Sequence, residues 1–248
     1  MASKFQLLTE PKAQPKGVKG EKEGYLTFIL HLAPATLSGY QVCPQSTPGC
    51  RAACLNTAGR GGMFKAGEFT NMIQRARIRK TKLFFEDRQT FMMILYEDIM
   101  RAVRMGIKEN MEVVVRLNGT SDIAWEKITF MLGSYKCPNM MAAYPTIQFY
   151  DYTKITNRLM KHMPSNYHLT FSKAESNDAD VEKVLMFTNT SVAVVFSTKA
   201  LPKTYLGVEV FNGDETDLRF LDPKNSVIGL YAKGKAKKDK TGFVVQVA

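Results

Sequence analysis

The stretch Glu112-Val-Val-Val-Arg-Leu117 has the length and composition of a β-strand, and the polar stretch Asn118-Gly-Thr-Ser-Asp122 follows it directly. Valine favours strands because its branched side chain packs well on a pleated surface. Short, nearly continuous apolar runs are typical of strands in parallel sheets, which are buried on both faces. The stretch therefore predicts a buried strand of a parallel sheet, with polar groups at its carboxyl end.

Apolar runs of the same kind recur along the chain and alternate with segments of helical periodicity. We predict strands over residues 25–32, 112–117, 146–150, 167–171, 192–196, 206–211 and 227–231. We predict helices over residues 66–82, 84–106, 125–135, 155–163 and 179–187. Repeated β-α units predict an α/β fold with a parallel sheet, and this number of strands favours a partial (β/α)6-type parallel barrel. A doubly wound sheet is the alternative. The sequence has no glycine fingerprint that opens a helix after a strand, so there is no dinucleotide signature to support that choice.

The chain is predicted to consist of a short arm and one domain. Residues 1–23 contain Pro11, Pro15 and several lysines, and they predict a loose, flexible basic arm. Residues 24–248 predict a single α/β domain. Within it, residues 33–62 form a loop rich in glycine, proline, serine and threonine. A loop of this length inside a compact domain usually carries function or needs an internal staple.

The chain has 248 residues and a formal net charge of +11. The excess of lysine and arginine favours an anionic partner, such as a nucleic acid or a nucleotide. Many of the lysines lie near the two ends, where simple solvation is the alternative explanation. No apolar run is long enough to span a membrane, and the first residues lack the apolar core of a secretory signal. We therefore expect a cytoplasmic protein with no membrane partner.

Three of the four cysteines lie in the long loop, as Cys43, Cys50 and Cys54, with the spacing C-x6-C-x3-C. In a reducing compartment, clustered cysteines are more typical of metal ligands than of disulfides. Three thiolates can bind three irons of a 4Fe–4S cluster and leave the fourth iron open. Zinc is the alternative, with Cys137 or His31 as a fourth ligand. A buried, unliganded Cys137 is the commoner outcome for a lone cysteine.

Polar residues also follow several of the other predicted strands. Active sites of parallel α/β folds lie at the carboxyl ends of the strands, so these residues are candidate site residues. They include Asp151, Tyr152, Thr153, Ser172, Lys173, Glu175, Ser197, Thr198 and Lys233. Helix capping and turn formation are the alternative for each of them. An acidic cluster near Arg219 is better explained by turns, and it comprises Asp214, Asp217 and Asp222.

Five sequence motifs resemble a family of bacteriophage proteins known as gene product 88. The motifs lie between about residues 25 and 245, and they are Cys43 to Gly61, Arg116 to Asp122, Gln148 to Lys154, Leu169 to Ser172 and Asp217 to Pro223. Several motifs in the same order make the resemblance fairly specific. It implies a phage origin, and with it the cytoplasm of the host cell as the location.

A weaker similarity is to the radical S-adenosylmethionine superfamily, in which a three-cysteine loop follows the first strand of a partial barrel. This chain departs from the usual C-x3-C-x2-C spacing at both gaps. The similarity implies a 4Fe–4S cluster, S-adenosylmethionine as cofactor and an external electron donor. It also implies that the segment after the second strand contacts the cofactor, through Asn118, Gly119, Thr120, Ser121 and Asp122. The alternative is a zinc-stabilised nucleic-acid-binding or host-interaction protein without catalysis.

Overall fold

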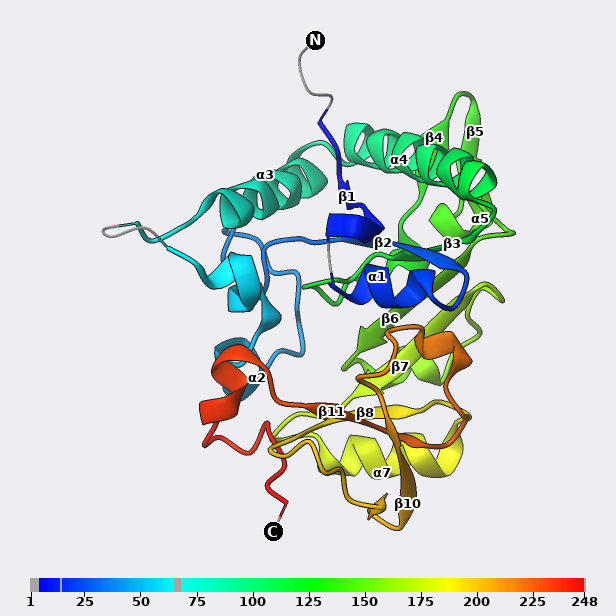
Figure 1. The fold of residues 1–248 in the computed structure, drawn as a ribbon. Coiled ribbons are helices and arrows are strands. Elements are labelled where there is room, and N and C mark those ends of the chain that lie inside the picture. The colour runs from blue at the N-terminus through cyan, green and yellow to red at the C-terminus, as the bar shows by residue number, and fades with distance from the viewer. Residues whose placement is uncertain (1–4, 14, 65–67, 248) are drawn as a thin grey trace.

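The computed structural model describes residues 5–13, 15–64 and 68–247, and Figure 1 shows the fold. A nine-stranded, mostly parallel sheet forms its centre. The strands lie side by side in the order β1 (Leu8–Thr9), β2 (Tyr25–Leu30), β3 (Glu112–Arg116), β6 (Gln148–Thr153), β7 (Tyr167–Ser172), β8 (Val192–Phe196), β11 (Val227–Tyr231), β10 (Val208–Asn212) and β9 (Thr204–Tyr205). The strands from β2 to β10 in this order are parallel, and β1 and β9 pair antiparallel at the two ends.

The helices surround the sheet, and a small hairpin lies outside it. The α-helices are α1 (Pro15–Glu21), α2 (Pro48–Ala52), α3 (Met72–Glu86), α4 (Arg88–Glu109), α5 (Met140–Ala143), α6 (Thr156–Leu159) and α7 (Asp178–Phe187). The hairpin pairs β4 (Phe130–Leu132) with β5 (Tyr135–Cys137). Short 3-10 helices lie at η1 (Pro11–Ala13), η2 (Leu55–Thr57), η3 (Gly59–Gly62), η4 (Trp125–Lys127), η5 (Arg219–Leu221) and η6 (Gly234–Lys238). No helix within the described ranges is long and apolar enough to cross a membrane.

Alternate residues of each strand face opposite sides of the sheet, and this alternation separates the core into two parts. Val113 and Val115 of β3 belong to the large core cluster that also contains Phe91 and Leu95 of α4. The intervening Val114 packs instead with Leu218, which precedes η5. Helices therefore cover one face of the sheet here, and the segment that leads to η5 covers the other.

The α/β class and the parallel strands are confirmed, but a closed or partial barrel is not shown. Among the described strands, β1 and β9 lie at the two edges of the sheet. The fold is best described as mixed α/β with a large, mostly parallel sheet. β10 also departs from chain order, because β11 lies between it and β8. No radical S-adenosylmethionine fold is supported.

The helix predicted over 125–135 is wrong, because these residues form η4, β4 and the first residue of β5. Gly133 has a φ of 62°, which turns the chain between the two strands. The other helices differ mainly in their bounds. The predicted 66–82 helix begins at Met72, after Asn71 accepts a hydrogen bond from the Gln74 N–H at 3.0 Å, and residues 65–67 lie outside the described ranges. The predicted 155–163 helix is limited to α6.

The predicted basic arm differs from the structure in the part that is described, while residues 1–4 and 14 lie outside it. Leu7 and Leu8 are buried, and β1 pairs with β2. The buried Asp98 carboxylate of α4 accepts the N–H of Leu7 at 2.7 Å and that of Leu8 at 3.0 Å, and it also pairs with Arg101. Two leucines and one buried carboxylate thus attach a segment whose composition alone predicts a solvated chain.

We expect Asp98→Ala to lower the free energy of unfolding by about 3 kcal/mol, because it leaves buried N–H donors without an acceptor. Urea unfolding of the full chain measures the loss. Glu109→Ala is the matched control, since Glu109 is an exposed residue at the end of the same helix. Equal stabilities of the two variants would show that the carboxylate does not hold the segment.

Candidate functional site

A cavity of about 260 Å³ lies at the carboxyl ends of β3, β6, β7 and β11. Its wall contains Cys43, Cys50 and Cys54 and the whole of the segment 118–122. The structure therefore brings together the two groups of residues that the sequence singled out, although they are far apart in the chain. A cavity at this edge of a parallel sheet is the usual position of a ligand site in α/β proteins.

The middle cysteine lies on the short helix α2, and Glu175 holds the start of that helix. The Glu175 carboxylate accepts the Gly49 N–H and the Thr47 hydroxyl, both at 2.6 Å. Thr47 in turn accepts the Cys50 N–H at 3.2 Å, as an N-cap residue does. One carboxylate from the loop after β7 thus fixes the turn that presents Cys50.

The close approach of the chain around α2 requires a glycine at position 49. A Cβ atom there would lie 2.1 Å from the Thr241 hydroxyl oxygen and 2.8 Å from Glu175 Oε1. Figure 1 shows the C-terminal segment, in red, next to α2. The cysteine loop is therefore packed between the loop after β7 and the end of the chain.

Backbone N–H groups point at the sulfur atoms of the other two cysteines. The Ala35 N–H donates to Cys43 Sγ at 3.4 Å, and the Asn56 N–H donates to Cys54 Sγ at 3.5 Å. Arg77 of α3 donates to the Asn56 side chain at 2.6 Å and so holds the turn after Cys54. Hydrogen bonds of this kind stabilise thiolates and tune the potential of iron–sulfur clusters.

Burial disfavours the thiolate forms of Cys43 and Cys54. Burial raises the pKa of Cys43 to about 11, and nearby Cys54, Asp122 and Cys50 add to the increase. Burial also raises the pKa of Cys54, with a further contribution from Cys50, while Arg77 and Lys154 act in the opposite direction. The cysteines therefore lie within electrostatic reach of one another, and a bound metal would have to displace their protons.

The segment 118–122 is held by its own side chains. The Asn118 side-chain oxygen accepts hydrogen bonds from Ser121 Oγ, Ile123 N–H and Trp125 Nε1, at 2.8 to 3.0 Å. Its amide group donates to the Ile123 carbonyl at 3.0 Å. The buried Asp151 carboxyl accepts the Asn118 N–H at 2.7 Å. Asn118 is thus occupied with shaping the loop, and its backbone neighbours form the cavity wall.

The last residue of this segment is also engaged within the protein. Asp122 accepts the Lys154 N–H at 2.8 Å and forms an ion pair with the buried Arg158 at 3.0 Å. The Thr120 hydroxyl donates to the Leu32 carbonyl at 2.5 Å. Gly119 has no room for a side chain, because a Cβ atom would lie 2.7 Å from the Leu30 carbonyl oxygen. The Gly119 N–H donates to the Leu30 carbonyl at 2.9 Å, and the Thr120 carbonyl accepts a hydrogen bond from Cys43 Sγ at 3.6 Å, which joins this segment to the cysteine loop.

The three cysteines of the cavity are not gathered around one metal-ion position. Within the described part of the chain, no group of three or more His, Cys, Asp or Glu side chains is placed to hold one metal ion. Cys137 is buried in the large core and donates to the Asn139 carbonyl at 3.2 Å, as expected for an unliganded cysteine. His31 does not line the cavity either, and burial lowers its pKa to about 3. Soft thiolate donors around one cavity nevertheless match the chemistry of iron–sulfur ligation.

Several residues that shape the site are not predictable from motif spacing. Glu175 is predicted only as a residue near a strand end and Lys154 only as the end of a motif, and their partners are distant in the chain. Arg77 belongs to a helix whose charges look solvated in the sequence, yet it supports the cysteine loop. Phe243 lines the cavity from the C-terminal segment, where no pattern in the sequence marks it.

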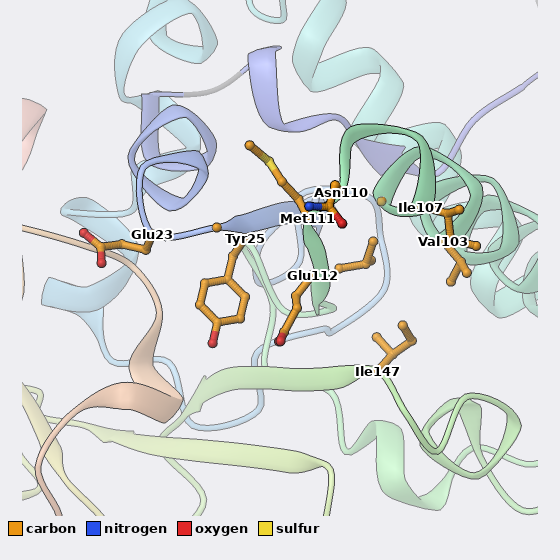
Figure 2. Close-up of a pocket in the computed structure, with 11 residues that line it drawn as sticks. Glu23, Tyr25, Val103, Ile107, Asn110, Met111, Glu112 and Ile147 are labelled. Carbon is orange, nitrogen blue, oxygen red and sulfur yellow. The ribbon is translucent and has the colours of Figure 1, made fainter.

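A second, wider cavity of about 700 Å³ lies at the opposite end of the strands. Figure 2 shows Tyr25 and Glu112, from the starts of β2 and β3, lying next to each other, with Val103 and Ile107 of α4 to one side. None of the predicted site residues lines this cavity. It also lies away from the carboxyl ends of the strands, so it does not compete with the cysteine cavity as the candidate site.

We expect Glu175→Ala to expose Cys50, because the start of α2 loses the acceptor of two hydrogen bonds. Labelling of the thiols with a disulfide reagent, followed by peptide analysis, should show faster modification of Cys50 than in the unchanged chain. Glu182→Ala on α7 is the control, since it removes the same charge at an exposed position. Unchanged labelling in Glu175→Ala would contradict the role of this carboxylate.

The buried Asp151 gives a prediction about pH. Burial raises the pKa of its carboxyl to about 7, whereas an unfolded chain has a value of about 3.9. Between these values the folded chain binds more protons, so Asp151 makes stability fall as pH rises, by at most about 1.4 kcal/mol per pH unit. Urea unfolding from pH 4 to 7 should show a smaller fall for Asp151→Asn than for the unchanged chain. An identical slope would mean that the carboxyl is ionised when folded, and Asp180→Asn is the control.

Comparisons with known proteins place the chain in a family without assigning it an activity. Residues 6–247 match the family model described as Gene product 88. No curated protein and no solved structure matches the chain. The weaker similarity to the radical S-adenosylmethionine superfamily therefore gains no support from these comparisons. The match covers almost the whole sequence, so the chain belongs to the phage gene product 88 family.

Proposed function

We propose that this chain is an iron–sulfur protein in which Cys43, Cys50 and Cys54 hold a 4Fe–4S cluster. The observation that carries the proposal is that all three cysteines line one cavity at the carboxyl ends of the parallel strands. The segment 118–122, which follows β3, lines the same cavity. Cys43, Cys50 and Cys54 would hold the cluster, and three thiolates would leave one of its four irons without a protein ligand.

The proposal favours a cluster over zinc for a geometric reason. Zinc needs four donors that converge on one ion at about 2.3 Å from each sulfur. In a cubane cluster each thiolate binds a different iron, so the sulfurs surround the centre without meeting at a point. The described residues offer three cysteines around one cavity and no convergent set for a single ion. This combination supports the cluster.

We further propose chemistry of the radical S-adenosylmethionine type, acting on a nucleic acid or nucleotide in the host cytoplasm. Such a cluster, once bound and reduced by an external donor, supplies an electron for reductive cleavage of S-adenosylmethionine. In support, the parallel strands β2, β3, β6, β7, β8 and β11 lie side by side in order of increasing residue number, with β10 between β8 and β11 in the chain but outside them in the sheet. Asn118 and Asp122 would hold the loop, and the backbone of Gly119, Thr120 and Ser121 would face the cofactor.

The alternative function is a zinc-stabilised module that binds nucleic acid or a host protein without catalysis. The net charge of +11 supports an anionic partner in either case. The positions of Cys137 and His31 weigh against this alternative, because neither lines the cavity to supply a fourth ligand. Metal analysis separates the two functions directly.

We expect the chain, purified without oxygen, to contain about four irons and a similar amount of sulfide per molecule. Single Cys→Ser changes at positions 43, 50 and 54 should each remove most of the iron and the visible absorbance of the cluster. Cys137→Ala is the matched control and should keep both. Stoichiometric zinc without iron would favour the alternative, and iron that persists in the three variants would contradict the assigned ligands.

A reaction test then follows on the iron-loaded chain. Incubation with dithionite and S-adenosylmethionine should produce methionine and 5′-deoxyadenosine, which chromatography detects. A loaded cluster without any cofactor cleavage would keep the iron–sulfur assignment and remove the proposed reaction.

A further inference from the structure

We infer that Lys154 forms a phosphate-binding position in the cysteine cavity, and that the ligand is a single nucleotide unit. Lys154 follows β6 and lines the cavity together with Ser172, which ends β7. Neither residue belongs to the cysteine triad or to the segment 118–122. The inference names the substrate class within the proposed function and rests on it for the ligand's role, but the binding itself needs no metal.

Lys154 is held in position from both ends. Its backbone N–H donates to Asp122 at 2.8 Å, and its ammonium group donates to Ser172 Oγ at 3.0 Å. The ammonium also lies 6.0 Å from the centre of the Phe243 ring, on the wall formed by the C-terminal segment. An ammonium has three donors, so the bond to Ser172 leaves capacity for a ligand. Its charge acts on Cys54, which places it beside the cysteines.

The other charged groups of the cavity are paired within the protein. Arg116 forms a buried ion pair with Asp217 at 3.0 Å, and Lys233 pairs with Asp214. Asp122 is taken by Arg158. Among the described residues, the Lys154 ammonium forms no such ion pair. The cavity therefore contains a positive charge without a neutralising carboxylate, which favours an anion.

The type of cation and the size of the cavity favour a nucleotide phosphate. Lysine is a common phosphate binder, in which the ammonium acts as a point charge and does not need the paired geometry of arginine. Apolar side chains such as Leu55 and Leu230, together with the Phe243 ring, line the remaining wall and can contact a base or sugar. A volume of about 260 Å³ lies just below the range of about 300–1,000 Å³ typical of small-molecule sites. In the metal-free chain this volume limits the ligand to one nucleotide unit and excludes a duplex.

Calorimetry with the full chain tests the inference. The probes are the four ribonucleoside 5′-monophosphates, the matching nucleosides, inorganic phosphate, methionine and a short single-stranded oligonucleotide. We expect at least one nucleotide to bind at least tenfold more tightly than its nucleoside. Lys154→Met should remove that difference and leave nucleoside binding unchanged, and Lys154→Arg should restore part of it. The oligonucleotide shows whether the unit is free or part of a strand.

The matched control is Lys183→Met, an equal loss of charge at an exposed position on α7, which should bind as the unchanged chain does. Equal binding of nucleotide and nucleoside, or nucleotide binding that survives Lys154→Met, would overturn the inference. If the binding of methionine depended on Lys154 as strongly as the binding of the nucleotides does, the choice of phosphate as the recognised group would be overturned. Nucleotide binding is measured on the metal-free chain, so failure of the metal test and failure of this test are distinguishable.

Discussion

Parallel strand pairing is the constraint on which the candidate site depends. Because the strands from β2 to β10 run in one direction, the loops that follow them emerge at the same edge of the sheet. The long loop after β2, the segment after β3, and the residues that end β6 and β7 thereby become neighbours. A cavity lined by residues separated by more than a hundred positions follows from this arrangement rather than from any local motif.

A network of polar groups under the cavity converts that proximity into fixed geometry. Asp151 of β6 accepts the Asn118 N–H at 2.7 Å and the Tyr167 hydroxyl of β7, also at 2.7 Å. Arg158 joins Asp122 to Glu126, at 3.0 and 2.8 Å. Such buried groups are costly unless each finds its partners, and here the partners come from three neighbouring strands and their loops. The hydrogen bonds of Asp151 and the ion pairs of Arg158 therefore hold the cavity wall in place.

Much of the fold was predictable from the sequence, because the buried strands are short apolar runs with little ambiguity. The errors have local physical causes. The residues from Trp125 onward include good helix formers, but Gly133 adopts a positive φ and the buried Phe130 pairs with Cys137 across a hairpin. Composition alone made residues 1–23 look solvated, and it could not reveal that Asp98 accepts two of their N–H groups. The cysteine triad was visible because of its spacing. Glu175 was a candidate as a residue after a strand, but its contact with the cysteine loop was not predictable, since it lies 126 residues from the Gly49 N–H that it accepts.

The exchanged order of the last two parallel strands has a consequence for synthesis on the ribosome. β10 is made before β11, yet in the sheet it contacts β11 and β9 and has no place beside β8. The β9–β10 pair therefore has to wait, as an unattached hairpin, until residues 227–231 have left the exit tunnel and occupied the gap. A chain released early, without these residues, would expose the edge of β8, which is a ready template for pairing with other molecules. Completion of the sheet thus depends on residues 227–231.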